Sequence, residues 1–283
     1  MEFVKAHGTG NDFVVVEDLA DRLRPSVGFV RAVCDRHFGV GADGLIRIAP
    51  GRAAPFLMDY RNADGTVAEM CGNGVRVVGK YLADRGLVGG DFDLETRAGV
   101  KRLQLHRGND GLVDRVTVDM GAPSFGRADL PMTGEGEALK EPLEAGGQVH
   151  VATCLSMGNP HAVVFVEQVD AVPLDQLGPL LETHPAFPNR TNVEVVQVLD
   201  EATVRQRTWE RGVGETLACG TGACAVAVAS QLRGHTGERV TVELRGGRLE
   251  LEWAPGRTVR MTGPAREVAH GTLVGELLGL LHA

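Results

Sequence analysis

The strongest constraint on the fold of this 283-residue chain is a glycine-flanked cysteine motif that occurs twice. Residues 71–74 read CGNG and residues 219–222 read CGTG, so the two cysteines are 148 positions apart. The same offset aligns Gly10-Asn11 with Gly158-Asn159. Three further alignments at this offset are Asn62 with Glu210, Gly44 with Asn192, and Arg85-Gly86 with Arg233-Gly234. Several matches at one fixed offset predict an internal duplication, in which both halves share one fold.

The duplication predicts where the two domains end. The pattern V-x-M-x-x-P occurs at residues 118–123 and again at 259–264, so the halves end alike after a small change in length. We therefore expect an N-terminal domain at residues 1–120 and a C-terminal domain at 121–264. The apolar terminal segment 265–283 is expected to complete the first domain. A chain of this length commonly divides into two domains.

Local patterns predict the same elements in each half. Short β-branched or alternating runs bounded by turn residues are typical of strands. The predicted strands are Val14–Val16, Lys101–His106, Val116–Met120, Val163–Val166, Arg239–Leu244, Arg248–Trp253 and Thr258–Met261. Residues 75–85 and 223–233 lack alternation and end in Arg-Gly, which is a helix stop signal. Because the second helix is apolar on every side, a curved sheet must surround it.

We therefore predict an α+β (mixed α/β) fold of two pseudo-symmetric domains. Each domain is expected to be a curved, largely antiparallel sheet around a central helix. The site would lie in the cleft between the two domains.

Composition excludes several classes of partner. The chain has 29 basic and 37 acidic residues, and a net charge of −8 disfavours binding to nucleic acid or to an anionic membrane. No segment approaches the roughly 18 apolar residues that span a bilayer. The first ten residues, MEFVKAHGTG, lack the apolar core of a signal peptide. These features predict a cytoplasmic protein.

The cysteines separate into a symmetric pair and three others. An odd number of cysteines without C-x-x-C spacing argues against a disulfide framework and a zinc site. Cys34, Cys154 and Cys224 have no symmetric context, so we expect them in the core. Cys71 and Cys219 share their glycine neighbours, which packing alone does not explain. They could also form a thiol redox pair.

Each duplicated cysteine precedes the amino-terminal end of a predicted helix. That end exposes backbone N–H groups and a partial positive charge, so we expect a thiol pKa below the usual ~8.5. The neighbouring N–H groups can bind a carboxylate. Inverting a stereocentre requires a proton to leave from one face and another to arrive on the opposite face. Two such thiols therefore suggest a racemase or epimerase.

Four segments of the sequence resemble diaminopimelate epimerase: residues 5–13, 61–74, 157–161 and 209–222. The segments lie in both halves, so the resemblance extends over essentially the full chain. The resemblance implies an isomerase that interconverts LL- and meso-2,6-diaminoheptanedioate for lysine and peptidoglycan precursor biosynthesis. It implies no pyridoxal phosphate, no other cofactor and no metal. It also implies a cytoplasmic homodimer whose partner is a small diamino diacid, with no nucleic acid and no membrane.

The resemblance also implies roles for individual residues. Cys71 and Cys219 would be the acid/base thiols, and His161 and Glu210 would tune their protonation. The carboxylate at the reacting end would bind the backbone N–H groups of Gly72, Asn73, Gly220 and Thr221. Arg211 would bind the distal carboxylate as a bidentate donor, and Glu210 would accept from an ammonium group. The remaining substrate-binding residues would be Asn11, Asn62, Asn159 and Asn192.

Several alternatives stay open. Some family members have glutamine at the position of Gly44, which cannot supply that contact and is left out of the site. Taken singly, His161 could be structural, Glu210-Arg211 a solvated pair, and an asparagine after glycine a turn residue. A proline racemase-like enzyme of the same fold would carry an Asp-Arg-Ser-Pro-like run in place of residues 216–218. A thiol redox protein is the alternative from another class.

Overall fold

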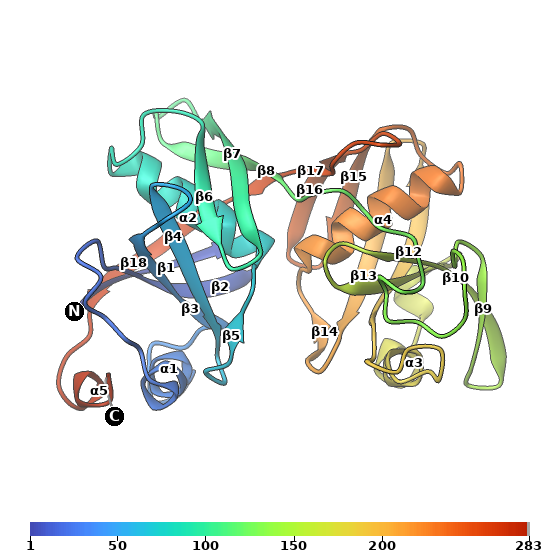
Figure 1. The fold of residues 1–283 in the computed structure, drawn as a ribbon, viewed down its shortest axis with the longest axis horizontal. Helices are drawn as coiled ribbons and strands as arrows, with labels where there is room; N and C mark the ends of the chain where they lie inside the picture. The colour runs from blue at the N-terminus through green and yellow to red at the C-terminus, as the bar shows by residue number, and fades with distance from the viewer. Residues whose placement is uncertain (282–283) are drawn as a thin grey trace. The chain divides into compact units, whose positions relative to one another are not determined.

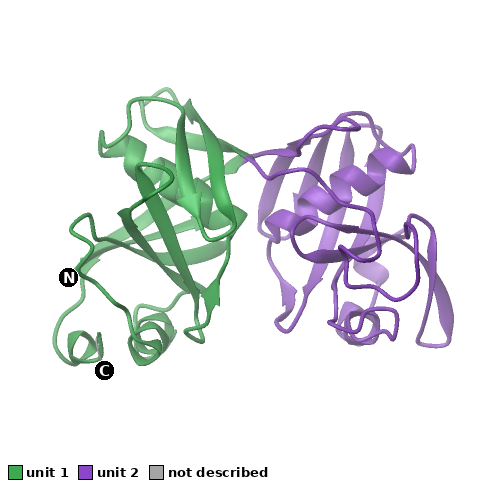
Figure 2. Cartoon of the chain, viewed as in Figure 1, with its two compact units in different colours: residues 1–118, 263–283 green, residues 119–262 purple. Residues whose placement is uncertain are grey.

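The computed structural model describes residues 1–281, and the chain divides into two compact units (Figure 2). Unit 1 contains residues 1–118 together with the described residues from 263 onward, and unit 2 contains residues 119–262. The predicted terminal segment includes His282 and Ala283, which lie outside the described residues. Each unit combines strands with a few helices (Figure 1).

Unit 1 contains one curved sheet. Its strands are β1 (Glu2–Gly8), β2 (Asn11–Glu17), β3 (Gly44–Pro50), β4 (Phe56–Asn62), β5 (Val67–Ala68), β6 (Phe92–Thr96), β7 (Gly99–Arg107), β8 (Val113–Asp119) and β18 (Arg266–Thr272). Its helices are α1 (Val27–Cys34), α2 (Gly72–Asp84) and α5 (Glu276–Gly279). The strand order is β18-β1-β2-β3-β4-β6-β7-β8, and only the pairs β2–β3 and β4–β6 in this order are parallel. The sheet is therefore largely antiparallel.

Unit 2 repeats this architecture. Its strands are β9 (Glu141–Ala145), β10 (Gln148–Ser156), β11 (Pro160–Phe165), β12 (Asn192–Asp200), β13 (Thr203–Glu210), β14 (Gly214–Thr216), β15 (Arg239–Leu244), β16 (Gly247–Glu252) and β17 (Arg260–Pro264). Its helices are η1 (Val169–Ala171), α3 (Leu174–Glu182) and α4 (Gly220–Leu232). The strand order is β9-β10-β11-β12-β13-β15-β16-β17. Its parallel pairs, β11–β12 and β13–β15, are the third and fifth pairs in the order, as in unit 1.

The duplication extends to individual backbone pairs. Helices α2 and α4 occupy equivalent residues at the offset of 148. Equivalent strand pairs are Phe13–Gly44 with His161–Asn192, and Ile46–Tyr60 with Glu194–Thr208. The predicted fold class, two pseudo-symmetric copies of one architecture, is confirmed.

The two predicted central helices are present, but they begin three residues earlier than expected. Cys71 and Cys219 are the N-cap residues, so each glycine pair lies in the first turn. Gly86 and Gly234 follow the helix ends with φ angles of 70° and 71°, the left-handed conformation expected of a C′ glycine. Helix α4 contacts β10, β11, β12, β13, β15 and β16, so the sheet surrounds it as predicted (Figure 1).

The predicted strands all lie within or overlap observed ones, with ends shifted by a few residues. The terminal segment of unit 1 pairs through β18 with β1, and Leu273 and Leu281 pack in the core beside α1. Cys34, Cys154 and Cys224 are buried, as expected of core thiols. Among residues 1–281, no helix combines the length and apolar character needed to cross a membrane.

Candidate active site

The cysteine of unit 2 lies at the start of α4 and is only 6% exposed. Its Sγ accepts a hydrogen bond of 3.3 Å from the Gly222 N–H and lies 3.5 Å from the Thr221 Oγ1. Burial raises the pKa of the Cys219 thiol, and the carboxylates of Glu210 and Glu194 raise it further. Hydrogen bonds from Thr221 and Gly222 act in the opposite direction.

The expectation of a lowered pKa is therefore wrong for Cys219. The partial charge at a helix end acts over about one turn and is worth roughly 0.3–1 kcal/mol at exposed sites. Removing a thiolate from water and placing it near two carboxylates costs more, so the neutral thiol is favoured. The helix end alone does not determine the protonation of this cysteine.

A chain of polar side chains continues from Cys219 into the core of unit 2. Asn159 donates from Nδ2 to the Thr221 Oγ1 at 3.2 Å, and the Asn159 Oδ1 lies 3.0 Å from the Nε2 of His161. The other ring nitrogen of His161, Nδ1, is 2.9 Å from the Glu194 Oε1. Both the histidine and the glutamate are 0% exposed. Unit 2 thus brings together four of the sequence-predicted site residues.

Glu194 was missed by the sequence reasoning. It lies in β12 within Asn-Val-Glu-Val-Val, where every residue is buried. A carboxylate between the valines of Val-Glu-Val-Val was the available signal, because such a group is rarely buried without a partner.

Three other predicted residues of unit 2 surround the end of β13. The Glu210 Oε1 accepts a 2.6 Å hydrogen bond from the hydroxyl of Thr216. The backbone N–H of Arg211 donates to the Asn192 Oδ1 at 3.0 Å, and the Asn192 Nδ2 donates to the Pro160 carbonyl at 2.8 Å. Arg211 is exposed, so its guanidinium is accessible to a ligand.

In unit 1, Cys71 lies at the start of α2 and donates to the Asn11 Oδ1 at 3.5 Å. The same oxygen accepts from the Asn73 Nδ2 at 3.2 Å, and the Asn11 Nδ2 donates to the Asp43 carboxylate at 2.8 Å. Asn62, at the end of β4, donates to the hydroxyl of Thr66 at 3.0 Å. Unit 1 thus brings Asn11, Cys71 and Asn73 together.

A second missed residue, Arg76, is fully buried in α2. It donates to the Asn73 Oδ1 at 2.8 Å, the Thr9 Oγ1 at 3.3 Å and the Gly72 carbonyl at 3.3 Å. Its Nε donates to the Pro264 carbonyl at 3.2 Å. This arginine therefore fixes the first turn of α2, which carries two predicted carboxylate-binding N–H groups. The equivalent residue in unit 2 is Cys224, so the repeat does not identify Arg76 as a shared residue.

Gly44 pairs with Asn62 across β3 and β4. A Cβ at this position would lie 2.5 Å from the Arg61 carbonyl oxygen and 2.5 Å from a ring carbon of Tyr60. The local backbone and Tyr60 therefore leave no room for a longer side chain, which accounts for glycine at this position.

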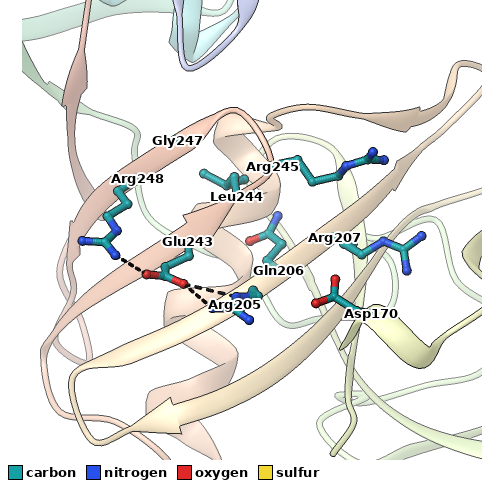
Figure 3. A pocket seen from close by; sticks show the side chains of 9 residues that line it. All are labelled: Asp170, Arg205, Gln206, Arg207, Glu243, Leu244, Arg245, Gly247 and Arg248. Carbon is teal, nitrogen blue, oxygen red and sulfur yellow. Dashed lines mark hydrogen bonds and ion pairs between the residues drawn. The ribbon is translucent and has the colours of Figure 1, made fainter. Parts of the chain in front are cut away.

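Two cavities outside these clusters lie at the surface beside ion pairs. One cavity of about 400 Å³ in unit 2 lies beside β13 and β15 (Figure 3). Arg205 and Arg248 both pair with Glu243, and Arg207 and Arg245 both pair with Glu215. Each of its four arginines is thus paired with a carboxylate, and the cavity is lined by none of the predicted site residues.

All five cysteines are free. Within residues 1–281, no group of three or more histidine, cysteine, aspartate or glutamate side chains is arranged to hold a metal ion. The functional groups of both clusters are therefore thiols, amides, a histidine, carboxylates and helix N–H groups. Such groups can exchange protons and bind carboxylates.

Several solved structures share this fold. A phenazine biosynthesis protein of the PhzF family from Bacillus anthracis superposes with a TM-score of 0.71 at 18% identity, over 97% of this chain and 99% of its own. A probable proline racemase from Agrobacterium radiobacter gives a TM-score of 0.69 at 17% identity, over 96% and 92%. These similarities concern the fold alone.

Sequence relatives are much closer. The family model described as diaminopimelate epimerase matches residues 3–126 and 153–268. A diaminopimelate epimerase from Pelotomaculum thermopropionicum is 53% identical over 96% of this chain and 98% of its own length. Another, from Moorella thermoacetica, is 49% identical over the same shares. The chain therefore belongs to the diaminopimelate epimerase family.

Proposed function

We propose that this protein is an isomerase that interconverts LL- and meso-2,6-diaminoheptanedioate through proton transfer by two thiols, without a metal or organic cofactor. The observation that carries the proposal is the repeated placement of Cys71 and Cys219 as N-cap residues of equivalent central helices. The names of relatives at about half identity support the substrate. The product would enter lysine and peptidoglycan precursor biosynthesis.

The proposed reaction moves two protons, one away from the α-carbon and one onto it. One cysteine, as thiolate, takes the α-proton, and the other, as thiol, gives a proton to the opposite face of the same carbon. The reverse reaction exchanges these roles. Negative charge develops toward the α-carboxylate when the proton leaves, and N–H groups at a helix start stabilise such charge. We assign this role to the backbone of Gly72, Asn73, Gly220 and Thr221.

Side chains around these helix starts would bind the rest of the substrate. The exposed guanidinium of Arg211 is assigned to the distal carboxylate, and Glu210 to an ammonium group. His161 and Glu210 are proposed to tune thiol protonation. The amides proposed to hydrogen-bond the substrate are those of Asn11, Asn62, Asn159 and Asn192.

We extend the proposal to the setting of the enzyme. The five free thiols support a reducing compartment, so we place the protein in the cytoplasm. The net charge of −8 argues against nucleic-acid and membrane partners. A homodimer is proposed from the family resemblance. Sedimentation equilibrium of the purified chain would test it.

The test of the function is solvent exchange. In deuterium oxide with reductant, the protein is expected to introduce deuterium at the α-carbon of both the LL and the meso isomer, because the thiols exchange protons with solvent. Mass spectrometry and chiral chromatography measure incorporation and inversion. L-Proline serves as the matched substrate control. Exchange with proline alone would favour the proline racemase alternative, and a folded sample without exchange on any substrate would refute epimerisation.

Arg211→Lys tests recognition of the distal carboxylate. Lysine keeps the charge but loses the planar bidentate fork, so kcat/KM is expected to fall by roughly 10- to 100-fold, mainly through KM. Arg239→Lys, at an arginine whose side chain is 82% exposed, is the control and should leave both constants unchanged. An unchanged KM in Arg211→Lys would remove this residue from the substrate-binding set.

A further inference from the structure

The two units differ in the groups packed beneath their cysteines. The position that a Cβ on Gly222 would occupy lies 2.5 Å from the Glu194 Oε1 and 3.2 Å from the Gln206 Nε2. A Cβ on Gly74 would lie 3.0 Å from the Ile46 Cδ1 and 3.5 Å from the Met58 Sδ. At the offset of 148, the residues that correspond are Ile46 with Glu194, Met58 with Gln206, and Phe13 with His161. Hydrocarbon and thioether in unit 1 are thus replaced by ionisable and amide groups in unit 2.

This replacement has an energetic cost. Glu194 and His161 are 0% exposed, and within residues 1–281 the Glu194 Oε2 has no hydrogen-bond partner. Burial of an ion pair is frequently less favourable than burial of apolar side chains of similar volume. Unit 1 demonstrates that the same fold accommodates apolar side chains at these positions. Packing therefore does not account for the His161–Glu194 pair, and a role in the chemistry of the neighbouring cysteine does.

The partners of His161 indicate what the pair does. Both ring nitrogens of His161 face oxygens, the Glu194 Oε1 and the Asn159 Oδ1. A carboxylate and an amide oxygen both accept hydrogen bonds, so both contacts are satisfied when each ring nitrogen donates. Asn159 then donates from Nδ2 to the Thr221 Oγ1. This oxygen accepts from Asn159, which leaves its own hydrogen free to point at the Sγ of Cys219, 3.5 Å away.

The equivalent asparagine of unit 1 has the opposite direction. The Nδ2 of Asn11 is held by the Asp43 carboxylate, and its Oδ1 accepts from the thiol of Cys71. The chain of unit 2 thus ends in a donor to sulfur, whereas the chain of unit 1 ends in an acceptor from sulfur. The direction in each unit is set by the charged group at its far end.

We propose that Glu194 is a positioning residue, which holds His161 in its doubly protonated form so that the chain through Asn159 and Thr221 ends as a donor to Cys219. The proposal rests on the proposed function, since it concerns a thiol that exchanges the α-proton. Unit 1 has no counterpart of this device, because its equivalent residues are Phe13 and Ile46.

The surroundings of Cys219 explain why donors are needed. Burial, Glu210 on β13 and Glu194 on β12 all raise the pKa of this thiol. Cys154, on β10, has a pKa raised by burial to about 12 and adds no cation. Strands β15 and β16 present buried apolar side chains, namely Val240, Val242, Leu249 and Leu251. Around Cys219, the thiolate is therefore favoured by the hydrogen bonds that Thr221 and Gly222 give to its sulfur.

Glu194→Gln tests the proposal by removing the charge while keeping the volume and one acceptor oxygen. Without the carboxylate, the Nδ1 of His161 no longer faces a charged acceptor, so the charged form of the ring is expected to be lost more readily as the pH rises. The variant should then lose about tenfold in kcat/KM at about pH 8, and less at about pH 6. The wild type should show no such fall. Glu201→Gln, on the turn between β12 and β13, removes the same charge as a control.

A double-mutant cycle identifies the route of the effect. If Glu194 acts through His161, Glu194→Gln/His161→Gln should be no slower than His161→Gln alone, because coupled residues are not additive. Losses that multiply, or a pH profile of Glu194→Gln parallel to that of the wild type, would overturn the proposal. Melting curves of all variants identify any that are unfolded.

Nitrogen NMR of the histidine-labelled wild type tests the proposal without a variant at Glu194. Both ring nitrogens of His161 are expected to carry protons at neutral pH, with the resonance assigned by its loss in His161→Gln. A neutral ring would overturn the proposal. Because this readout needs no substrate, it stays decisive even if deuterium exchange refutes the proposed function.

Discussion

Cys71→Ala and Cys219→Ala are each expected to reduce the rate of inversion by at least about 10³-fold, within the range that general acid–base groups contribute. Each thiol serves as base in one direction and as acid in the other. Neither direction of the reaction can therefore proceed normally when one thiol is removed. Chiral chromatography of product formed from the LL and meso isomers measures the loss in both directions.

The chain contains a matched control for each unit. Cys34→Ala in unit 1 and Cys154→Ala in unit 2 remove thiols that lie in apolar core clusters and are not N-cap residues. Both variants should keep near wild-type turnover with a modest loss of stability. If either Cys71→Ala or Cys219→Ala retained comparable turnover, the mechanism with two thiols would be wrong.

Gly222→Ala is expected to have the next largest effect. The added methyl would lie 2.5 Å from the Glu194 Oε1 and 3.2 Å from the Cys219 Sγ. Overpacking of this kind costs about 1–3 kcal/mol, from which the higher helix propensity of alanine recovers up to about 1 kcal/mol. Because the clash displaces the thiol and the carboxylate together, turnover should fall on the order of 100-fold.

Gly74→Ala provides the control for this prediction. Its methyl would meet the Ile46 Cδ1 at 3.0 Å and the Met58 Sδ at 3.5 Å, and both are flexible parts of side chains that can move. The loss of turnover should therefore be less than about tenfold, with the melting temperature nearly unchanged. Kinetics and thermal unfolding of both variants measure the difference. Equal losses would show that the polar cluster of unit 2 does not distinguish the two glycines.

Much of the fold could be predicted because the duplication is visible in the residues that both halves retain. The central helices, their C′ glycines and the alternating strands follow from local patterns. The helix starts were placed too late, because residues 72–74 contain two glycines with low helix propensity. Strands such as β3, buried on both faces, could not be identified by alternation, since a continuous apolar run also fits a helix.

The site was harder to predict where the two halves differ. A repeat draws attention to positions where both halves carry the same residue. Arg76 and Glu194 are not such positions, because their equivalents at the offset of 148 are Cys224 and Ile46. Their importance arises from tertiary burial, which the sequence pattern does not report. The pKa shift of Cys219 is opposite in direction to the prediction for the same reason, because the dominant causes are burial and two carboxylates from two other elements, β12 and β13.

The pairing of β1 with β18 has a consequence for the order of folding during synthesis. Glu2 pairs with Thr272, so the sheet of unit 1 can be completed only after almost the entire chain has been synthesised. Unit 2 is one continuous segment and can acquire all its strands earlier. Since domains fold as their sequence becomes available, unit 2 can complete its fold before β18, the last strand of unit 1, has been synthesised.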